Sequence, residues 1–181
     1  MLKTLWNQDL LYQTLRCTPH CPRCVTSLSS HEVALGYREN TPDPSVFIKF
    51  QVNPRSSSEK IEVLEKLGAE DIDVFLLAWT TTPWTLPANR AVALSVDLDY
   101  VLLDLGGRRV LVAEALAEDC AQRFGAERHE IIGRAKGAAL EGLSVMPPFG
   151  EAPVPIVLGE HVTTEAGTGC VHTAPAHGLE D

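Results

Sequence analysis

Two short segments of this 181-residue sequence concentrate side chains and backbone groups that can hold a polar substrate. The first, Trp79–Pro87, reads WTTTPWTLP and follows an apolar run. Its hydroxyls donate and accept hydrogen bonds, so they suit an ester oxygen, a ribose or a bound water. The second, Gly167–Asp181, reads GTGCVHTAPAHGLED and combines glycines and histidines with the carboxylate of Asp181.

The three consecutive threonines of the first segment differ in the direction that a strand would give them. Successive side chains of a strand point to opposite faces, so Thr80 and Thr82 are expected to share one side while Thr81 points away. Threonine is also a good strand residue, which explains the cluster without any function. A pocket, if the segment forms one, is expected on the Thr80 and Thr82 side.

A cysteine cluster near the start of the chain suggests metal chemistry. Cys21-Pro-Arg-Cys24 is half of a tetrahedral zinc site. Cys17 and His20 are further candidate ligands, but the four residues are packed within a short stretch that is tight for one ion. This pattern supports an alternative function, a zinc-knuckle binding module without catalysis.

Composition indicates a reduced, cytoplasmic protein. Apolar residues make up 45% of the chain and charged residues 22%, which is enough for a packed core. Five cysteines are an odd number, which favours free thiols over a disulfide framework. The formal net charge of −9 repels nucleic acid at long range, so any nucleic-acid partner, tRNA or DNA, would need help from elsewhere. The sequence shows neither a membrane span nor a signal peptide.

Hydrophobic periodicity predicts the elements that must position these residues. A helical stripe runs from Leu2 to Leu15 and stops near the cysteines. Residues 45–52 alternate as a half-buried strand, and residues 58–67 predict a short helix ended by Gly68. Further strands are expected at 73–79, 91–96, 100–105, 108–112, 130–133, 143–146, 154–158 and 169–172, with a helix over 113–124.

Many short strands with few helices predict an α+β, mainly β fold: a β-barrel core with peripheral helices. Residues 1–44 would form a lead-in helix and the CxxC knuckle, and residues 45–181 the barrel. Together they are expected to be one folded unit. The density of special residues up to Asp181 suggests a piece of a longer protein.

The two segments identify a resemblance to a known family. Trp79–Asn89 and Gly167–Asp181 closely resemble the threonine-rich and GTG–HxAPAHGxxD segments of the editing (CP1) domain of isoleucyl-tRNA synthetases. Cys21–Cys24 and Asp43–Phe50 resemble the stretch leading into that domain. Valyl and leucyl relatives typically carry an arginine soon after the threonines and no histidine in the GTG segment, whereas this chain has Pro83-Trp84 and His172.

The resemblance implies proofreading: hydrolysis of valine wrongly attached to tRNA(Ile), with valyl-adenylate as a second candidate substrate. One missing methylene changes binding by only ~1–3 kcal/mol, a limit for which this synthetase is itself the usual example. No cofactor is required for editing, and zinc at Cys21 and Cys24 would need the second ligand pair that the family has elsewhere. The remaining partner is the rest of the synthetase, and the isolated domain is expected to be monomeric and to bind tRNA weakly.

The resemblance also implies residue roles. Asp181 is the candidate for the substrate ammonium, His172 limits the pocket, and a held water attacks the ester. Catalytic candidates are Thr80, Thr82, His172 and Asp181; substrate-binding candidates are Thr81, Trp84, Gly167, Gly169, Ala174, His177 and Asp181.

Three alternatives stay open. Trp84 could line the side-chain pocket or stack on the adenine, and it is equally well explained as a core residue. Cys170, His172 and Asp181 could form a cysteine hydrolase, which we disfavour because the family has a small apolar residue at the Cys170 position. A valyl-type editing domain would prefer threonine as its target.

Overall fold

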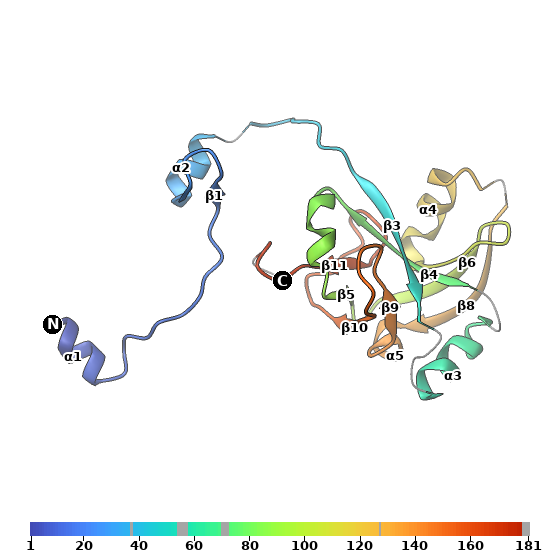
Figure 1. Ribbon diagram of the computed structural model, residues 1–181. Helices are drawn as coiled ribbons and strands as arrows, with labels where there is room; N and C mark the ends of the chain where they lie inside the picture. Colours follow the sequence, from blue (N-terminus) through green and yellow to red (C-terminus); the bar gives the residue numbers. More distant parts are fainter. Residues whose placement is uncertain (37, 54–57, 70–72, 127, 179–181) are drawn as a thin grey trace. The chain divides into compact units, whose positions relative to one another are not determined.

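The computed structural model describes residues 1–36, 38–53, 58–69, 73–126 and 128–178, and the chain forms two compact units, Met1–Pro42 and Asp43–Asp181 (Figure 1). Whether the two make one folded unit stays a prediction. The first unit contains α1 (Leu2–Asn7), β1 (His20–Cys21), β2 (Thr26–Ser27) and α2 (Ser30–Leu35). The second contains β3 (Val46–Val52), α3 (Ser58–Lys66), β4 (Val74–Thr80), η1 (Pro83–Ala88), β5 (Ala91–Leu94), β6 (Asp99–Asp104), β7 (Arg109–Ala113), η2 (Glu114–Leu116), α4 (Ala117–Arg123), β8 (Glu130–Lys136), α5 (Gly137–Leu140), β9 (Ser144–Met146), β10 (Val154–Leu158) and β11 (Val171–Thr173).

The opening helix is shorter than its apolar stripe predicts. α1 ends at Asn7, and Asp9 has a positive φ of 54°, which breaks the helical path. None of the described residues of this unit is buried, and Leu15 is fully exposed. A short helix depends on tertiary packing of its apolar face, and this unit provides none, so the predicted helix to Leu15 is wrong beyond Asn7.

The sequence prediction also missed the second helix of this unit. α2 begins after Ser29, whose hydroxyl accepts a hydrogen bond from the Glu32 N–H, while Glu32 Oε2 accepts one from the Ser29 N–H at 2.8 Å. This reciprocal pair is a capping box, and it stabilises a helix of only six residues.

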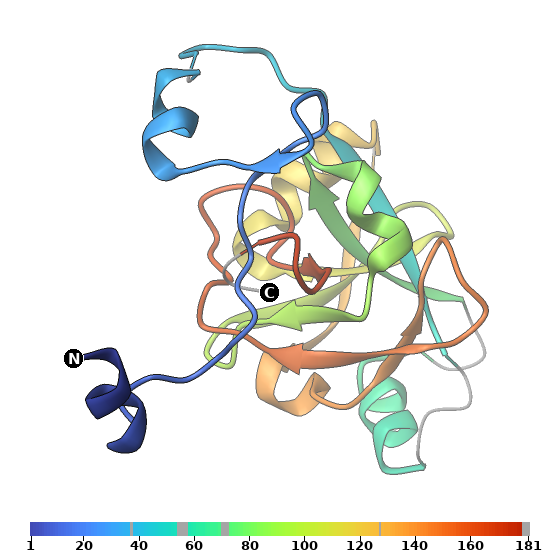
Figure 2. The ribbon, with the colours of Figure 1, turned by 60° about the vertical axis from the view of Figure 1, so that its left-hand side comes forward.

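A nine-stranded mixed sheet forms the second unit, in the order β11-β5-β10-β9-β3-β4-β7-β6-β8. Most neighbours are antiparallel, but β4–β7 and β5–β10 are parallel. The sheet is strongly curved (Figure 2), and its edge strand β11 contacts β4 in the middle of the strand order. The predicted mainly β fold with peripheral helices is thereby confirmed, and the curvature places the two polar segments side by side.

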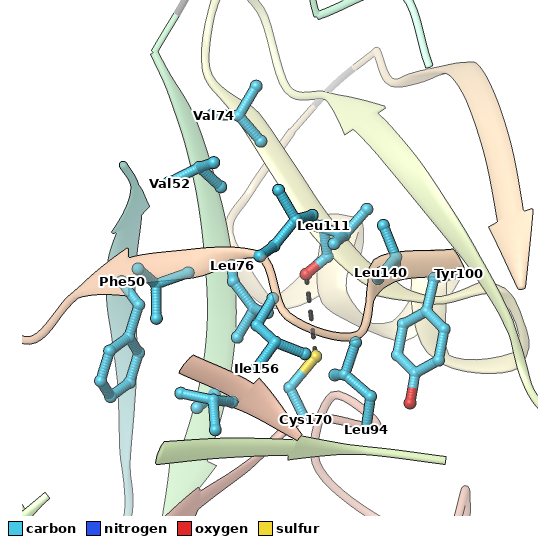
Figure 3. Close-up of a cluster of buried hydrophobic side chains, with 14 of the residues drawn as sticks. Phe50, Val52, Val74, Leu76, Leu94, Tyr100, Leu111, Leu140, Ile156 and Cys170 are labelled. Atoms are coloured by element: carbon cyan, nitrogen blue, oxygen red, sulfur yellow. Dashed lines mark hydrogen bonds between the residues drawn. The ribbon is translucent and has the colours of Figure 1, made fainter. Parts of the chain in front are cut away.

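β3 and β4 show how burial selects these strands. On β3 the alternation is real: Ile48, Phe50 and Val52 are buried. β4 is buried on both faces, with Leu76 in the core cluster drawn in Figure 3 and Leu77 in a second cluster beneath α4. A continuous apolar run is typical of such a doubly covered strand.

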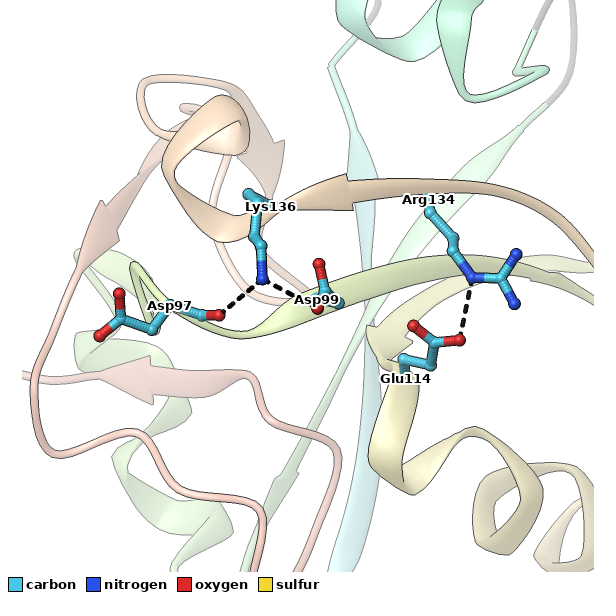
Figure 4. Close-up of polar contacts among 5 residues, drawn as sticks. All are labelled: Asp97, Asp99, Glu114, Arg134 and Lys136. Carbon is cyan, nitrogen blue, oxygen red and sulfur yellow. Dashed lines mark hydrogen bonds and ion pairs between the residues drawn. The ribbon is translucent and has the colours of Figure 1, made fainter.

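The far edge of the sheet is tied together by a glycine turn and by surface charges. Gly106 and Gly107 both have positive φ and join β6 to β7. Two ion pairs join β8 to neighbouring elements (Figure 4): Lys136 Nζ is 2.8 Å from an Asp99 carboxylate oxygen on β6, and Arg134 Nε is 2.9 Å from Glu114 Oε1 on η2. Both are substantially exposed, so each contributes little to stability. Within the described residues, no helix is long and apolar enough to cross a membrane.

Candidate active site

One cavity brings the two polar segments of the sequence together. Its volume is about 380 Å³, and residues from both segments face it, joined by one histidine from another loop. It is lined by Trp79, Thr80, Thr82, Thr85, His161, Val171, His172 and His177. β11 reaches this place because it pairs with β5, with His172 opposite Val92, and because the sheet curves until β11 contacts β4.

The threonines of the first segment lie as the face argument predicts, although for a different local reason. β4 ends at Thr80, and the Thr82 N–H donates to Thr80 Oγ1 at 3.0 Å, which closes a tight turn. The hydroxyl oxygens of Thr80 and Thr82 are 3.2 Å apart, and both residues line the cavity. Thr81 is half-buried and outside the described lining. The shared side of Thr80 and Thr82 is confirmed, but a turn, not a continuing strand, produces it.

A short 3-10 helix follows this turn and was not predicted. η1 begins with Pro83, whose fixed φ and missing N–H suit a first helical position. The Thr85 N–H donates to Thr82 O at 3.1 Å, and the Thr85 hydroxyl donates to the same carbonyl at 2.8 Å. Thr85 is thereby buried and directed into the site. In the sequence, Pro83 and the three-residue spacing between Thr82 and Thr85 indicate this helix.

His172 is buried and held through both ring nitrogens. Its Nε2 lies 2.9 Å from Thr85 Oγ1, and its Nδ1 lies 3.4 Å from Asn89 Nδ2. Asn89 Nδ2 also donates to Ala91 O at 2.8 Å and to Thr173 O at 3.4 Å. Sequence reasoning had named neither Thr85 nor Asn89 as a site residue, because nothing in a single sequence shows which distant side chain they meet.

Two exposed histidines complete the rim of the cavity. His177 Nδ1 lies 3.0 Å from Pro175 O, and since a carbonyl only accepts, the proton of this ring is on Nδ1. His161 follows β10, and no motif in the sequence singles it out. The nearby residue that leaves room for the His161 ring is Gly159, where a Cβ would come within 2.6 Å of His161 Cε1. Among the described residues no group of three or more histidine, cysteine or carboxylate side chains is arranged to hold a metal ion.

The predicted glycines and Ala174 serve packing in the structure. Gly167 has a φ of +84°, and a Cβ there would be 3.2 Å from Trp79 Cε3, so its backbone lies against the aromatic wall of the cavity. Gly169 has a φ of +72° and packs against Ala113 on β7. Ala174 is buried. Direct contact of these residues with a substrate stays a prediction.

Trp84 differs from its two sequence interpretations. Its side chain is 71% exposed, so the core interpretation is wrong. It does not belong to the described lining either, where Trp79 supplies the aromatic wall. Stacking of Trp84 on an adenine stays a prediction.

Cys170 does not have the environment of a nucleophile. It precedes β11 and is buried in the core, where its Sγ lies 4.0 Å from Leu111 O (Figure 3). Burial raises the pKa of its thiol far above the ordinary range, which disfavours the reactive thiolate. The cysteine-hydrolase alternative is therefore contradicted. Asp181 lies outside the described residues, and its role stays a prediction.

In the first unit, Cys21 and Cys24 occupy the turn of the β1–β2 hairpin. The Cys24 N–H donates to Cys21 Sγ at 3.4 Å, and this contact lowers the pKa of the Cys21 thiol. The Val25 N–H donates to Cys21 O at 2.8 Å, with Val25 at a φ of 54°. A backbone N–H directed at a thiolate sulfur suits half of a zinc site.

Comparison with solved structures defines the class of fold. GlLeuRS-CP1 matches with a TM-score of 0.65 and 19% identity, over 73% of this chain and 55% of that chain. The P. knowlesi cytosolic leucyl-tRNA synthetase editing domain matches with a TM-score of 0.58 and 16% identity, over 75% of this chain and 60% of that chain. The fold is that of the CP1 editing domain of class I aminoacyl-tRNA synthetases.

Comparison of sequences identifies the relatives of this chain. No family model matches the sequence. Isoleucine–tRNA ligase of Dehalococcoides mccartyi is 40% identical over 99% of this chain, and that of Halorhodospira halophila is 50% identical over 89%. This chain spans 19% and 17% of their respective lengths. Over nearly its whole length, this chain is therefore similar to a segment of isoleucine–tRNA ligases.

Proposed function

We propose that this chain is a hydrolase that removes valine wrongly attached to tRNA(Ile). The observation that carries the proposal is the cavity in which the Thr80 and Thr82 hydroxyls face the His172 side of the sheet. At about 380 Å³ it is near the small end of ligand sites, so it can enclose a small amino acid ester. Valyl-adenylate is the second candidate substrate of the same cavity.

The proposed mechanism is direct attack by a held water. The Thr80 and Thr82 hydroxyls, 3.2 Å apart, bind the water or the ester oxygen and stabilise the charge that develops on it. His172 closes the pocket, Asp181 binds the ammonium, and a hydroxyl of the terminal ribose assists the water. No cofactor takes part in this scheme.

A deacylation assay tests the proposal. The 181-residue chain should hydrolyse valyl-tRNA(Ile) and spare isoleucyl-tRNA(Ile). Thr82→Val keeps the shape but removes a hydroxyl, so it should slow the reaction by about 10²–10³-fold if that hydroxyl binds the developing charge. Thr163→Val, at an exposed threonine outside the described lining, is the matched control. Equal rates with both esters would contradict the proposal, and preference for a threonyl ester would favour the valyl-type alternative.

The cysteine hairpin supports a separate structural proposal. Cys21 and Cys24 would provide two of the four ligands of a zinc ion. The zinc would cross-link the chain and take no part in the editing reaction. Elemental analysis of the chain and of Cys21→Ser tests this. Stoichiometric zinc in a chain without any deacylase activity would favour the binding-module alternative.

The partners follow from charge and from the length of the relatives. A net charge of −9 disfavours strong binding of tRNA by this segment alone. The remainder of a cytoplasmic synthetase would therefore provide most of the contacts with tRNA. The isolated chain should be a monomer that binds tRNA weakly. Submicromolar affinity at physiological salt would contradict this.

A further inference from the structure

The strongest unexplained feature of the cavity is the chain of polar groups behind His172. Thr85 lies between the Thr82 carbonyl and His172 Nε2, at 2.8 and 2.9 Å. Asn89 lies on the other side, 3.4 Å from Nδ1. Thr85, Asn89 and His172 are all buried, and they come from segments more than 80 residues apart.

The partners of Thr85 decide where the proton of the His172 ring lies. A threonine hydroxyl has one proton, and the Thr82 carbonyl can only accept it. The same hydroxyl oxygen must therefore accept from His172, which places a proton on Nε2. Asn89 Nδ2 donates to two carbonyls, so its amide orientation is fixed and an amino group that cannot accept a hydrogen bond faces Nδ1. A proton on Nδ1 would find no acceptor there.

The opposite tautomer would create two conflicts at once. A proton on Nδ1 would point at the Asn89 amide donor, and the Thr85 hydroxyl would have to leave the Thr82 carbonyl to serve Nε2. Buried polar groups without partners cost about 1–3 kcal/mol each, so the network selects one state.

We propose that Thr85, together with Asn89, fixes His172 as the neutral ring protonated on Nε2, and that Thr85 is a positioning residue for substrate selectivity. In this state Nε2 donates to Thr85, and Nδ1 faces the Asn89 amide group inside the protein. His172 therefore acts on the substrate as a wall of fixed position and not as a general base. The part concerning selectivity rests on the proposed editing function.

Thr85 also connects His172 to the pair of hydroxyls from Thr80 and Thr82. The carbonyl that accepts its proton belongs to Thr82, whose own hydroxyl is 3.2 Å from Thr80 Oγ1. A change at Thr85 thus releases the ring and alters one lining residue, while the contact between the Thr80 and Thr82 hydroxyls does not involve the Thr85 side chain. Release of the wall should admit the larger amino acid more than it slows hydrolysis of the smaller one.

The tautomer is measurable without any substrate. In the ¹⁵N-labelled 181-residue chain, long-range ¹H–¹⁵N spectra should show His172 with a protonated Nε2 and an unprotonated Nδ1. Thr85→Ser keeps the hydroxyl and should preserve this pattern, whereas Thr85→Val should give a mixture of tautomers. Thr163→Val is the control and should leave the pattern unchanged. A ring protonated on Nδ1, or on both nitrogens, in the unchanged chain would overturn the proposal even if no variant folds.

Deacylation then tests the positioning role. The valyl-to-isoleucyl rate ratio should fall at least 10-fold in Thr85→Val and return in Thr85→Ser, with melting temperatures recorded for each. A Thr85→Val chain that folds and keeps the ratio would refute the positioning role. A chain that hydrolyses neither ester refutes the editing function and its selectivity part, and the spectra still decide the proton assignment.

Discussion

Gly169→Ala is expected to destabilise the sheet unit by about 2–5 kcal/mol, for reasons of packing. Gly169 has a φ of +72°, a conformation that costs a residue with a Cβ about 1–2 kcal/mol. The new Cβ would also overlap the Ala113 Cβ. Overpacking of this kind costs about 1–3 kcal/mol.

Neither side of this contact can easily move away. The Gly169 carbonyl accepts a 2.7 Å hydrogen bond from the Tyr100 hydroxyl, and the Ala113 N–H donates to Thr168 O at 2.9 Å. The two backbones are thus held at their present separation. Moving the two backbones apart would break one of these hydrogen bonds. The cost of the Cβ overlap should therefore be fully present in the measured loss of stability.

Urea unfolding of matched variants separates the two contributions. Gly106→Ala is the control, because Gly106 has a similar φ of +76° and nothing within 4 Å of its Cβ position. It should cost only about 1–2 kcal/mol. Combining Gly169→Ala with Ala113→Gly removes the overlapping methyl and should show a coupling of about 1–3 kcal/mol in a double-mutant cycle.

Two results would refute this reasoning. One is an equal loss of stability in Gly169→Ala and Gly106→Ala. The other is the absence of coupling to Ala113. If Gly169 instead exists to admit a substrate, Gly169→Ala should slow deacylation while costing no more stability than Gly106→Ala.

Three further predictions concern buried and rim groups. Tyr100 is fully buried and accepts from Ser95 N–H at 2.9 Å, so Tyr100→Phe should cost about 1–3 kcal/mol in urea unfolding. Burial raises the pKa of Tyr100, so its stabilisation should be complete below about pH 10 and decline at higher pH, and this decline should weaken in Tyr100→Phe. Iodoacetamide near neutral pH should label Cys21, whose pKa is lowered, well before Cys170, whose pKa is raised by burial, as read by peptide mass spectrometry; equal labelling in the folded chain would contradict this. Gly159→Ala should displace the His161 ring and shift its NMR signals with little change in melting temperature, and unchanged signals would contradict the contact.

The parts of the fold that the sequence predicted depend on local chemistry. β3 alternates because one face is buried, β4 is continuously apolar because both faces are covered, and two glycines with positive φ turn β6 into β7. The stripe from Leu2 to Leu15 has equally good periodicity, yet its helix ends at Asn7. Periodicity shows which face of a helix could be buried. Whether another element covers that face depends on the tertiary structure.

The candidate site also has one part that the local sequence predicts and another that depends on the tertiary structure. That Thr80 and Thr82 share a side follows from the immediate sequence, and either a strand or a turn can produce it. Thr85 and His172 are 87 positions apart, and only the curvature that lays β11 against β4 makes them partners.

The curvature also explains why both segments named by the resemblance meet at one cavity while only some of their side chains line it. The two motifs meet because β11 is an edge strand that reaches the middle of the sheet. Within them, position in the motif does not say whether a side chain faces the cavity: Trp84 points to solvent, and Trp79, five residues earlier on β4, forms the wall. Since β4 is buried on both faces while η1 lies outside the strand, residues of one motif experience different environments. Selectivity in this cavity should therefore respond most to residues such as Thr85 that join the two motifs.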